Sequence, residues 1–468
     1  MKRQCINPYL PLEEHIPDGE PRVFDGRLYV FGSHDKENGS EFCELDYVAW
    51  SAPVEDLSDW RYEGVIYRKD QDPYNTQQLP LYAPDVVQGQ DGRYYLYYCV
   101  KFQDAIHVAV ADTPQGPYEF YARVSYPDGR VLCENQPYDP SVLCCDGKVY
   151  LYYGFAPCMI NIPRYRGQDL KGCSVVELGS DMCTVLQGPT VVLPSLQYGK
   201  GTSFEGNEYF EGPSIRKIGS WYYLIYSSVH THQLCYARST SPLSGFTFGG
   251  CIVSNGDVGV GGRTEQDKLM SVGNNHGGLV EVNGQWYIFY HRHTSLTQYN
   301  RQGCAERIAI QEDGHIPQVS ITTSGMNPGP LSGICDYPAV YCCNLTNGHM
   351  GALSSLGRTN TEVDFPFLTC TDGQRYVTNI GENTLIGYKY LALEETGTLG
   401  VEYRCQKGGQ LEVRTAPDGA ARAVLELPPC QEWECCQTKV SFDASEQELY
   451  FVYHGSGRME LLNILLRR

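Results

Sequence analysis

The sequence contains no run of about 18 apolar residues, which excludes a transmembrane helix. Basic residues are also scarce: 36 Lys and Arg stand against 55 Asp and Glu, and the net charge is −19. Nucleic acids and anionic membranes bind basic surfaces, so we expect neither as a partner. Lys2 and Arg3 are followed by Gln4-Cys-Ile-Asn-Pro8, which is not the apolar core of a secretory signal. We therefore expect a cytoplasmic protein.

Motifs for metals, phosphates and nucleophilic serines are missing as well. None of the 20 cysteines form a C-x-x-C pair, and zinc-ligand spacing is absent. The sequence has no Walker loop, no H-E-x-x-H and no nucleophile-elbow serine. We expect most cysteines to be small buried apolar residues of a reducing compartment, including the adjacent ones Cys144-Cys145, Cys342-Cys343 and Cys435-Cys436.

The residues that are abundant indicate an all-β protein. There are 49 Gly, 27 Pro and 36 Tyr but only 7 Met, and no long stretch has a helical period. This composition is typical of many short strands joined by turns. A chain of 468 residues is long enough for two or three domains, or for one large repetitive domain and a smaller one.

One unit recurs five times in the first 320 residues. Each copy begins with a polar lead residue, and a glycine seven or eight positions later opens a strand of the form Gly-x-x-Tyr. The lead residue and glycine of the copies are Asp18 and Gly26, Asp85 and Gly92, Asp139 and Gly147, Glu211 and Gly219, and His276 and Gly284. Successive lead residues are 54 to 72 positions apart, room for about four strands per copy. The repeat predicts a five-bladed β-propeller over residues 1–330.

The lead residues should converge on the axis of the propeller, because each starts the innermost strand of a blade. Four of the five are carboxylates. A single Asp at a strand end usually makes a turn, but several acids around one axis repel one another and point to a function. Two carboxylates can hydrolyse a glycosidic bond, and a third can raise the pKa of the acid. No cofactor is needed for this chemistry.

Five motifs resemble glycoside hydrolase family 43, whose members are five-bladed inverting pentosidases. The resemblance covers about residues 5 to 325, and the motifs are Asn7-Pro-Tyr-Leu-Pro11, Ile16-Pro-Asp-Gly-Glu-Pro21, Tyr82-Ala-Pro-Asp85, Tyr138-Asp-Pro-Ser141 and Tyr209-Phe-Glu-Gly-Pro213. It implies that Asp18 is the general base, Glu211 the general acid and Asp139 the carboxylate that raises the pKa of the acid. Glu20 is an alternative base, but we expect it at the rim or in a turn.

The resemblance also implies roles for residues around the catalytic acids. His276 is similar to a histidine that lies near a structural calcium or its water shell on the axis. Arg301 is similar to an arginine that contacts the sugar, and Asp85 aligns with a supporting position that we also count among the substrate-binding residues. His34 and Asp35 end the first Gly-x-x-Tyr strand, where they are candidates for the pocket wall.

The predicted reaction is a single displacement by water with inversion, for which the two carboxyl groups stand about 6.5 to 9.5 Å apart. An aromatic ring should pack against the sugar. The candidates for this ring are Tyr82, Tyr138, Phe210 and Trp221.

Residues 340–468 continue with alternating strands beyond a junction at 334–347 and predict a β-sandwich. Ile386-Gly-Tyr-Lys-Tyr390, Trp433 and Leu449-Tyr-Phe-Val-Tyr-His-Gly455 are similar to carbohydrate-binding module family 6. The alternative is a buttress that supports the propeller without binding sugar.

The motifs also bear on other functions of propeller proteins. A fructan-cleaving propeller would carry Asn-Asp-Pro-Asn-Gly, and a phosphorylase would need a basic phosphate site. A non-catalytic sugar-binding propeller has no need for all three acids. An oligosaccharide is the expected partner, and cytoplasmic placement favours exo-action. The sequence does not decide whether the released sugar is α-L-arabinofuranose or β-D-xylose. An endo-acting arabinanase or xylanase of the same family is a further alternative.

Overall fold

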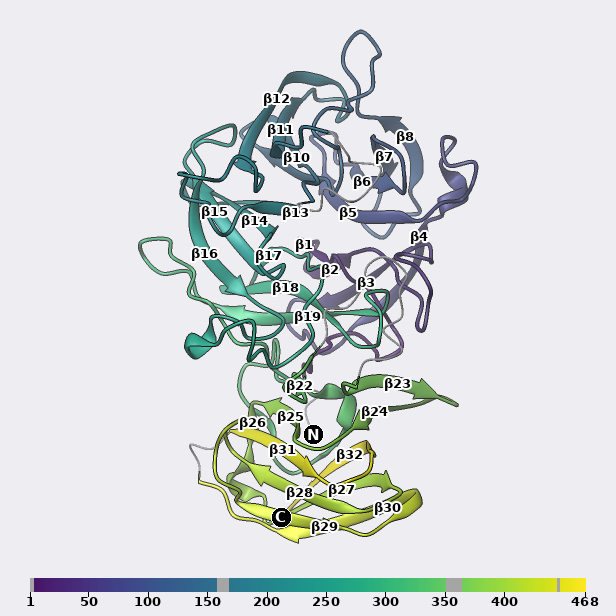
Figure 1. Ribbon diagram of the computed structural model, residues 1–468. Helices are drawn as coiled ribbons and strands as arrows, with labels where there is room; N and C mark the ends of the chain where they lie inside the picture. Colours follow the sequence, from purple (N-terminus) through teal and green to yellow (C-terminus); the bar gives the residue numbers. More distant parts are fainter. Residues whose placement is uncertain (1–3, 158–167, 351–363, 444–446) are drawn as a thin grey trace.

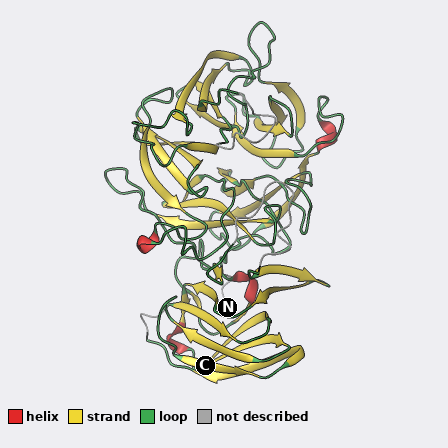
Figure 2. Cartoon of the chain, in the orientation of Figure 1, coloured by secondary structure: helices red, strands yellow, loops and turns green. Residues whose placement is uncertain are grey.

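The computed structural model describes residues 4–157, 168–350, 364–443 and 447–468. These residues form an all-β molecule in which a ring of sheets is followed by two further sheets (Figure 1, Figure 2). The helices within the described ranges are short 3-10 turns: η1 (Lys69–Gln71), η3 (Val260–Gly262), η4 (Ala339–Tyr341) and η5 (Leu393–Glu395). None of the described helices could reach across a bilayer.

The ring consists of five antiparallel sheets, four with four strands and the last with three. The first contains β1 (Glu20–Phe24), β2 (Arg27–Phe31), β3 (Tyr47–Pro53) and β4 (Arg61–Tyr67). The second contains β5 (Leu81–Gln88), β6 (Tyr94–Val100), β7 (Ile106–Ala111) and β8 (Glu119–Arg123). The third contains β9 (Ser141–Cys145), β10 (Lys148–Tyr153), β11 (Gly172–Leu178) and β12 (Val185–Pro194). The fourth contains β13 (Tyr209–Ile218), β14 (Trp221–Ser228), β15 (Leu234–Ser239) and β16 (Thr247–Val253). The fifth contains β17 (Leu279–Val282), β18 (Gln285–His293) and β19 (Arg301–Ile308).

The repeat found in the sequence corresponds to the first turn of each blade. All five repeat glycines have φ between +60° and +83°, namely Gly26, Gly92, Gly147, Gly219 and Gly284. Glycine adopts this left-handed conformation at little cost, so it is favoured where the innermost strand turns into the next. The prediction of a five-bladed β-propeller is confirmed.

The ring closes between its first and last blades. A parallel bridge joins Gly19 to Gly277, and β1 contacts both β5 and β17. The segment before β1 runs beside β19: the Asn7 side chain donates to the carbonyl of Ala305 and accepts from its N–H, both at 3.0 Å. The N-terminal segment thus stands where a fourth strand of the last blade would be.

Buried tyrosines fill the space between blades. Tyr97 of the second blade and Tyr153 of the third are fully buried in one apolar cluster with Val142 and Leu151. Large rings of this kind remove much apolar area from water, which explains the high tyrosine content.

Two antiparallel sheets follow the propeller, with a short parallel pair beside them. One sheet has six strands: β21 (Asp336–Pro338), β23 (Phe367–Thr371), β24 (Gln374–Ile380), β27 (Thr398–Cys405), β30 (Cys430–Lys439) and β32 (Met459–Arg467). The other has five: β22 (Asn344–Thr346), β25 (Thr384–Lys389), β28 (Gly409–Arg414), β29 (Ala423–Leu427) and β31 (Glu448–His454). The parallel pair consists of β20 (Leu331–Ser332) and β26 (Leu391–Ala392).

The two larger sheets share one apolar core, as a β-sandwich does. Val377 and Val401 of the first sheet pack with Leu411 and Phe451 of the second. The chain enters these sheets at β21, inside the predicted junction, so most of that junction is part of the sandwich. Figure 1 shows the sandwich below the propeller, with its strands β22, β23 and β24 on the side next to the propeller.

Candidate active site

Three carboxylates meet at the axis, and irregular backbone places each of them. Asp18 and Asp139 each lie two residues before the first residue of a strand, β1 and β9, and have φ values of +57° and +52°. Glu211 lies in β13 where the register with β14 shifts on both sides of it. Left-handed residues and β-bulges turn side chains away from the regular sheet direction. Here they occur at all three carboxylates of the predicted catalytic set.

Asp18 is held by an arginine and a histidine. Nη1 of Arg301 donates to its two carboxylate oxygens at 3.1 and 3.3 Å, and the Asp18 N–H donates to Nδ1 of His291 at 3.2 Å. Burial lowers the pKa of His291 well below its usual value, so its ring is neutral, with Nε2 donating to the Asn274 carbonyl at 2.8 Å. Burial alone would raise the pKa of Asp18, but the charge of Arg301 opposes it and the pKa is about 2. Asp18 is therefore ionised at neutral pH.

Arg301 is enclosed and fixed by Asp35. Its Nε and Nη2 donate to the two oxygens of Asp35 at 2.8 and 2.9 Å, and its backbone N–H donates to the same carboxylate at 3.2 Å. The guanidinium lies 4.7 Å from the centre of the Phe42 ring. Asp35 is only 1% exposed, so it orients Arg301 rather than forming the pocket wall. Arg301 in turn is directed at Asp18.

A glycine connects the other two carboxylates to His276. The N–H of Gly212 donates to Asp139 at 3.1 Å, and Gly212 directly follows Glu211. Gly212 has φ +66°, and a Cβ there would lie 2.9 Å from Cγ of His276. A larger residue would therefore push apart the groups around the acids.

The pKa of Glu211 moves opposite to that of Asp18. Burial raises it well above its usual value, and the charges of Asp139 and Asp18 raise it further, against Arg301. Burial also raises the pKa of Asp139 to about 6, with His276 opposing and Asp18 contributing. At neutral pH a protonated Glu211 thus shares the site with an ionised Asp18, which is the pairing that acid–base catalysis needs.

Glu20 occupies the axis and corrects our expectation of a rim or turn position. It is 1% exposed, and Arg216 donates to its Oε2 at 2.7 Å. Burial would raise its pKa, but Arg216 and Arg22 lower it. Its other oxygen lies 3.9 Å from Nε2 of His276, and neither atom has a hydrogen-bond partner among the described residues.

Asp85 joins three blades. Nη2 of Arg22 donates to its two oxygens at 2.7 and 2.6 Å, and the Val142 N–H donates to Oδ2 at 2.8 Å. The Asp85 side chain has no exposed surface, which argues for the supporting role rather than a contact with substrate. His34 is half-buried, and its Nδ1 lies 2.8 Å from the Asp46 carbonyl oxygen.

An aromatic arc runs beside the carboxylates. We define it as Tyr82, Tyr138, Phe155, Phe210 and His232, whose successive ring centres are 6.2, 5.8, 5.6 and 4.5 Å apart. Two members directly precede Asp139 and Glu211 in the chain. The arc brings together three of the four rings proposed from the sequence.

Trp221 is the exception. It pairs with Ile218 at the end of the β13–β14 hairpin, whereas Glu211 pairs with Ser227 near the other end. Trp221 instead packs beside Arg238, whose guanidinium lies 4.9 Å from the centre of its ring. We therefore remove it from the candidates for a sugar contact.

Three histidines near the site, His232, His291 and His293, were not among the residues expected from the sequence. His291 and His293 lie at the end of β18, and Nε2 of each donates to the Asn274 carbonyl at 2.8 Å. Burial lowers the pKa of His293 to about 3 and that of His232 to about 4. Two histidines at alternate positions of one strand lie on the same face, and this pattern could have indicated them.

Comparison with known proteins agrees with the geometry. A family model for glycosyl hydrolases family 43 matches residues 24–316. A xylosidase/arabinosidase of Thermoclostridium stercorarium is 45% identical over 100% of this chain and 99% of its own length. A xylosidase/arabinosidase of Bacteroides ovatus is 30% identical, over 60% of this chain and 87% of its own length.

Solved structures agree too. A family 43 enzyme of Xanthomonas citri complexed with xylose superposes with a TM-score of 0.53 at 26% identity, over 68% of this chain and 96% of the other. An arabinoxylan arabinofuranohydrolase of Bacillus subtilis in complex with cellotetraose has the same fold over 99% of this chain and 97% of its own, with a TM-score of 0.51 at 20% identity. The chain belongs to glycosyl hydrolases family 43.

Proposed function

We propose that this protein releases a terminal pentose, α-L-arabinofuranose or β-D-xylose, from plant cell-wall oligosaccharides by inverting hydrolysis. The observation that carries the proposal is the opposed protonation of two carboxyl groups in one site, with the pKa of Asp18 at about 2 and that of Glu211 raised well above its usual value. Both relatives are xylosidase/arabinosidases, which supports a pentose as the released sugar.

In the proposed reaction Asp18 takes a proton from water as the water oxygen bonds to the anomeric carbon. The bond from that carbon to the leaving oxygen breaks at the same time, and Glu211 gives its proton to the leaving oxygen. Burial of Glu211 and the negative charge of Asp139 keep Glu211 protonated until this step. The aromatic arc offers a ring face on which the C–H groups of the sugar can pack.

The test uses aryl α-L-arabinofuranosides and aryl β-D-xylosides with good and poor leaving groups. Glu211→Gln and Glu211→Ala should lower kcat on poor leaving groups by about 10²- to 10⁴-fold and much less on good ones, because only the poor ones need the acid. Proton NMR at early times should show the inverted anomer. If wild type cleaves neither aryl pentoside and also leaves arabino- and xylo-oligosaccharides intact, the non-catalytic sugar-binding alternative replaces hydrolysis. Internal cleavage of a polymer would instead indicate endo-action.

If a structural calcium binds on the axis, water molecules must supply most of its ligands. The described residues include no group of three or more His, Cys, Asp or Glu side chains suited to a metal. His276 Nε2 and Glu20 Oε1 are the two atoms that would face the ion, whereas calcium takes six to eight oxygen ligands. When bound, the ion would supply positive charge beside the acids. Calcium added after chelation should raise Tm; an unchanged Tm would exclude the ion.

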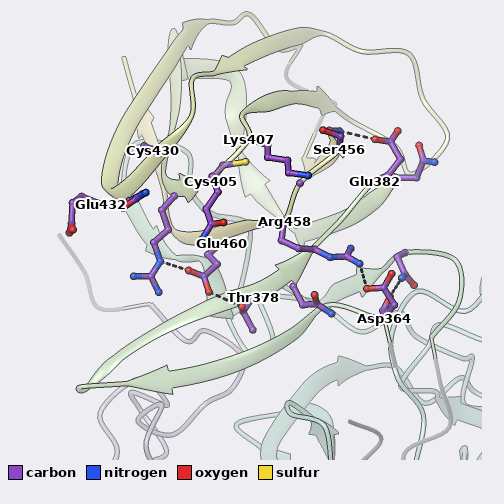
Figure 3. Close-up of a pocket in the computed structure, with 18 of the residues that line it drawn as sticks. Asp364, Thr378, Glu382, Cys405, Lys407, Cys430, Glu432, Ser456, Arg458 and Glu460 are labelled. Atoms are coloured by element: carbon purple, nitrogen blue, oxygen red, sulfur yellow. Dashed lines mark hydrogen bonds and ion pairs between the residues drawn. The ribbon is translucent and has the colours of Figure 1, made fainter. Parts of the chain in front are cut away.

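For the C-terminal domain we propose support of the propeller as the main role. The alternative, suggested by the sequence similarity to carbohydrate-binding module family 6, is that the domain binds sugar. The candidate site for this is a cleft of about 1180 Å³ in the sandwich (Figure 3). Among the residues that line the cleft are Thr378, Glu382, Lys407, Glu432, Arg458 and Glu460. Trp433 is not among them, and the Arg404 guanidinium covers its ring at 4.4 Å.

Affinity electrophoresis in soluble arabinoxylan tests this assignment. If the domain only supports the propeller, sugar binding comes from the propeller alone. Wild type and Lys407→Ala, which alters the cleft, should then be retarded equally. Loss of retardation in the variant would restore the sugar-binding module.

Cytoplasmic placement remains our proposal. No disulfide joins the described cysteines, not even Cys235 and Cys251, which are paired residues on neighbouring strands. Free thiols in such pairs suit a reducing compartment. Titration of thiols in the isolated protein would contradict this placement if most of them were oxidised.

A further inference from the structure

The hairpin formed by β23 and β24 leaves the body of the sandwich and lies against the propeller (Figure 1). Arg375 of this hairpin donates from Nε and Nη2 to the two oxygens of Glu37 at 3.0 and 2.9 Å. The N–H of Leu368 donates to the carbonyl of Thr294 at 2.8 Å. The hairpin therefore holds two separate loops of the propeller.

Both of these loops carry groups of the catalytic site. Glu37 lies two residues after Asp35, and the loop that begins at Thr294 ends at Arg301. The loops are also joined to each other, because the Asn38 N–H donates to the side chain of Asn300 at 2.5 Å. A force on either loop is thus transmitted to the Asp35–Arg301 pair.

Apolar packing fixes the same contact. Leu296, in the loop before Arg301, packs with Phe367 of β23 against the buried side chains of Met350 and Phe365. Nearer the site, Tyr299 packs edge-on against Phe42 at 4.8 Å between ring centres, and Phe42 lies under Arg301. Through the backbone of the loop that carries both Leu296 and Tyr299, these contacts connect the sandwich to the guanidinium that holds Asp18.

We propose that Arg375 is a positioning residue of the catalytic site, which acts through Glu37 and the Asp35–Arg301 pair on the general base. The C-terminal domain thereby completes the active site of the propeller. The inference rests on the proposed function, because it assigns the base to Asp18.

The exposure of the pair separates this role from simple stabilisation. The side chains of Arg375 and Glu37 are 22% and 29% exposed, and ion pairs at such positions contribute little to stability. A displacement of Arg301 should have a larger effect on the rate, because small displacements of catalytic groups lower rates strongly. Loss of the pair should therefore affect catalysis more than unfolding.

The experiment compares wild type with Arg375→Met, Glu37→Arg and the reversed pair Glu37→Arg/Arg375→Glu. Arg414→Met is the matched control, because the Arg414–Glu412 pair of β28 has side-chain exposures of 21% and 25% and lies within the sandwich. For each variant, kcat, KM, Tm and the pH profile of kcat/KM are measured on the aryl pentoside that wild type cleaves best.

The two single variants should lower kcat about tenfold with little change in KM or Tm. The acidic limb of the profile should move to higher pH, because a displaced Arg301 no longer holds the pKa of Asp18 down. The reversed pair should recover activity, and Arg414→Met should match wild type. Unchanged kcat and acidic limb in both single variants, or equal effects in Arg414→Met, would overturn the proposal. An inactive wild type would count against the proposed function instead.

Discussion

Asp18 and Glu211 share a buried site, yet their carboxyl groups differ in charge at neutral pH. Arg301 keeps Asp18 ionised, whereas burial and two neighbouring carboxylates keep Glu211 protonated. Asp139 couples the two, because it adds to the shift of Glu211 and is itself raised to a pKa of about 6.

Asp139→Asn tests this coupling. Activity requires protonated Glu211, so it falls as pH rises through the raised pKa of that group. Removal of the negative neighbour lowers this pKa, and the alkaline limb of kcat/KM should move to lower pH by about one unit. The limb is measured on an aryl pentoside, with the exposed carboxylate variant Asp128→Asn as control. A limb that stays in place or moves to higher pH would show that Asp139 does not tune Glu211.

At the scale of elements, the bulge in β13 is the feature on which the acid depends. The register with β14 shifts on both sides of the Glu211–Ser227 pair, and regular pairing resumes at Ser214. Gly212 is needed there for two reasons, since its φ is +66° and His276 occupies the space of a Cβ. The β13–β14 turn offers a comparison, because Gly219 has φ +60° with nothing within 4 Å of its Cβ position.

Gly212→Ala and Gly219→Ala therefore separate backbone strain from the clash. Gly219→Ala should cost about 1 kcal/mol of unfolding free energy with kcat unchanged. Gly212→Ala should cost about 2 to 3 kcal/mol and lower kcat, since its N–H also donates to Asp139. Urea unfolding and kcat are compared side by side. Equal losses in both variants would mean that His276 yields without consequence for the acid.

The whole molecule is held together by buried polar contacts between the propeller and the sandwich. Nζ of Lys389, in β25, lies 2.7 Å from Asp257 of the propeller, and the side chains are 5% and 3% exposed. Arg292 of β18 donates to the carbonyls of Val340 and Cys342 at 2.8 and 2.7 Å. The two parts should therefore unfold together.

Lys389→Met leaves Asp257 buried without its partner and should cost about 3 to 5 kcal/mol. The double variant Lys389→Met/Asp257→Asn should recover part of this, because the uncompensated charge is gone. Arg467→Met removes an exposed pair with Asp336, at 49% and 47% exposure, and should cost less than about 1 kcal/mol. Denaturation followed by both far-UV and near-UV signals checks the cost; two separate transitions in wild type would contradict joint unfolding.

The blades could be predicted from the sequence because a local cause repeats in each, a glycine with positive φ before a buried strand. Contacts between distant segments could not. Nothing near Glu20 in the sequence indicates Arg216, which lies 196 residues away and draws it to the axis. Asp35 likewise looked like a wall residue until Arg301, 266 residues later, was seen to occupy both its oxygens.

The closure of the ring by the N-terminal segment sets an order of events during synthesis. Asn7 is made 298 residues before Ala305, the residue whose backbone it binds. The first blade must therefore wait, with its neighbour on one side missing, until nearly the entire propeller has left the ribosome. Pairings this distant in sequence form slowly, and the waiting edge is a place where nascent chains can associate wrongly. The segment that completes the ring thus also leaves one sheet edge of the first blade open until synthesis of the propeller is nearly finished.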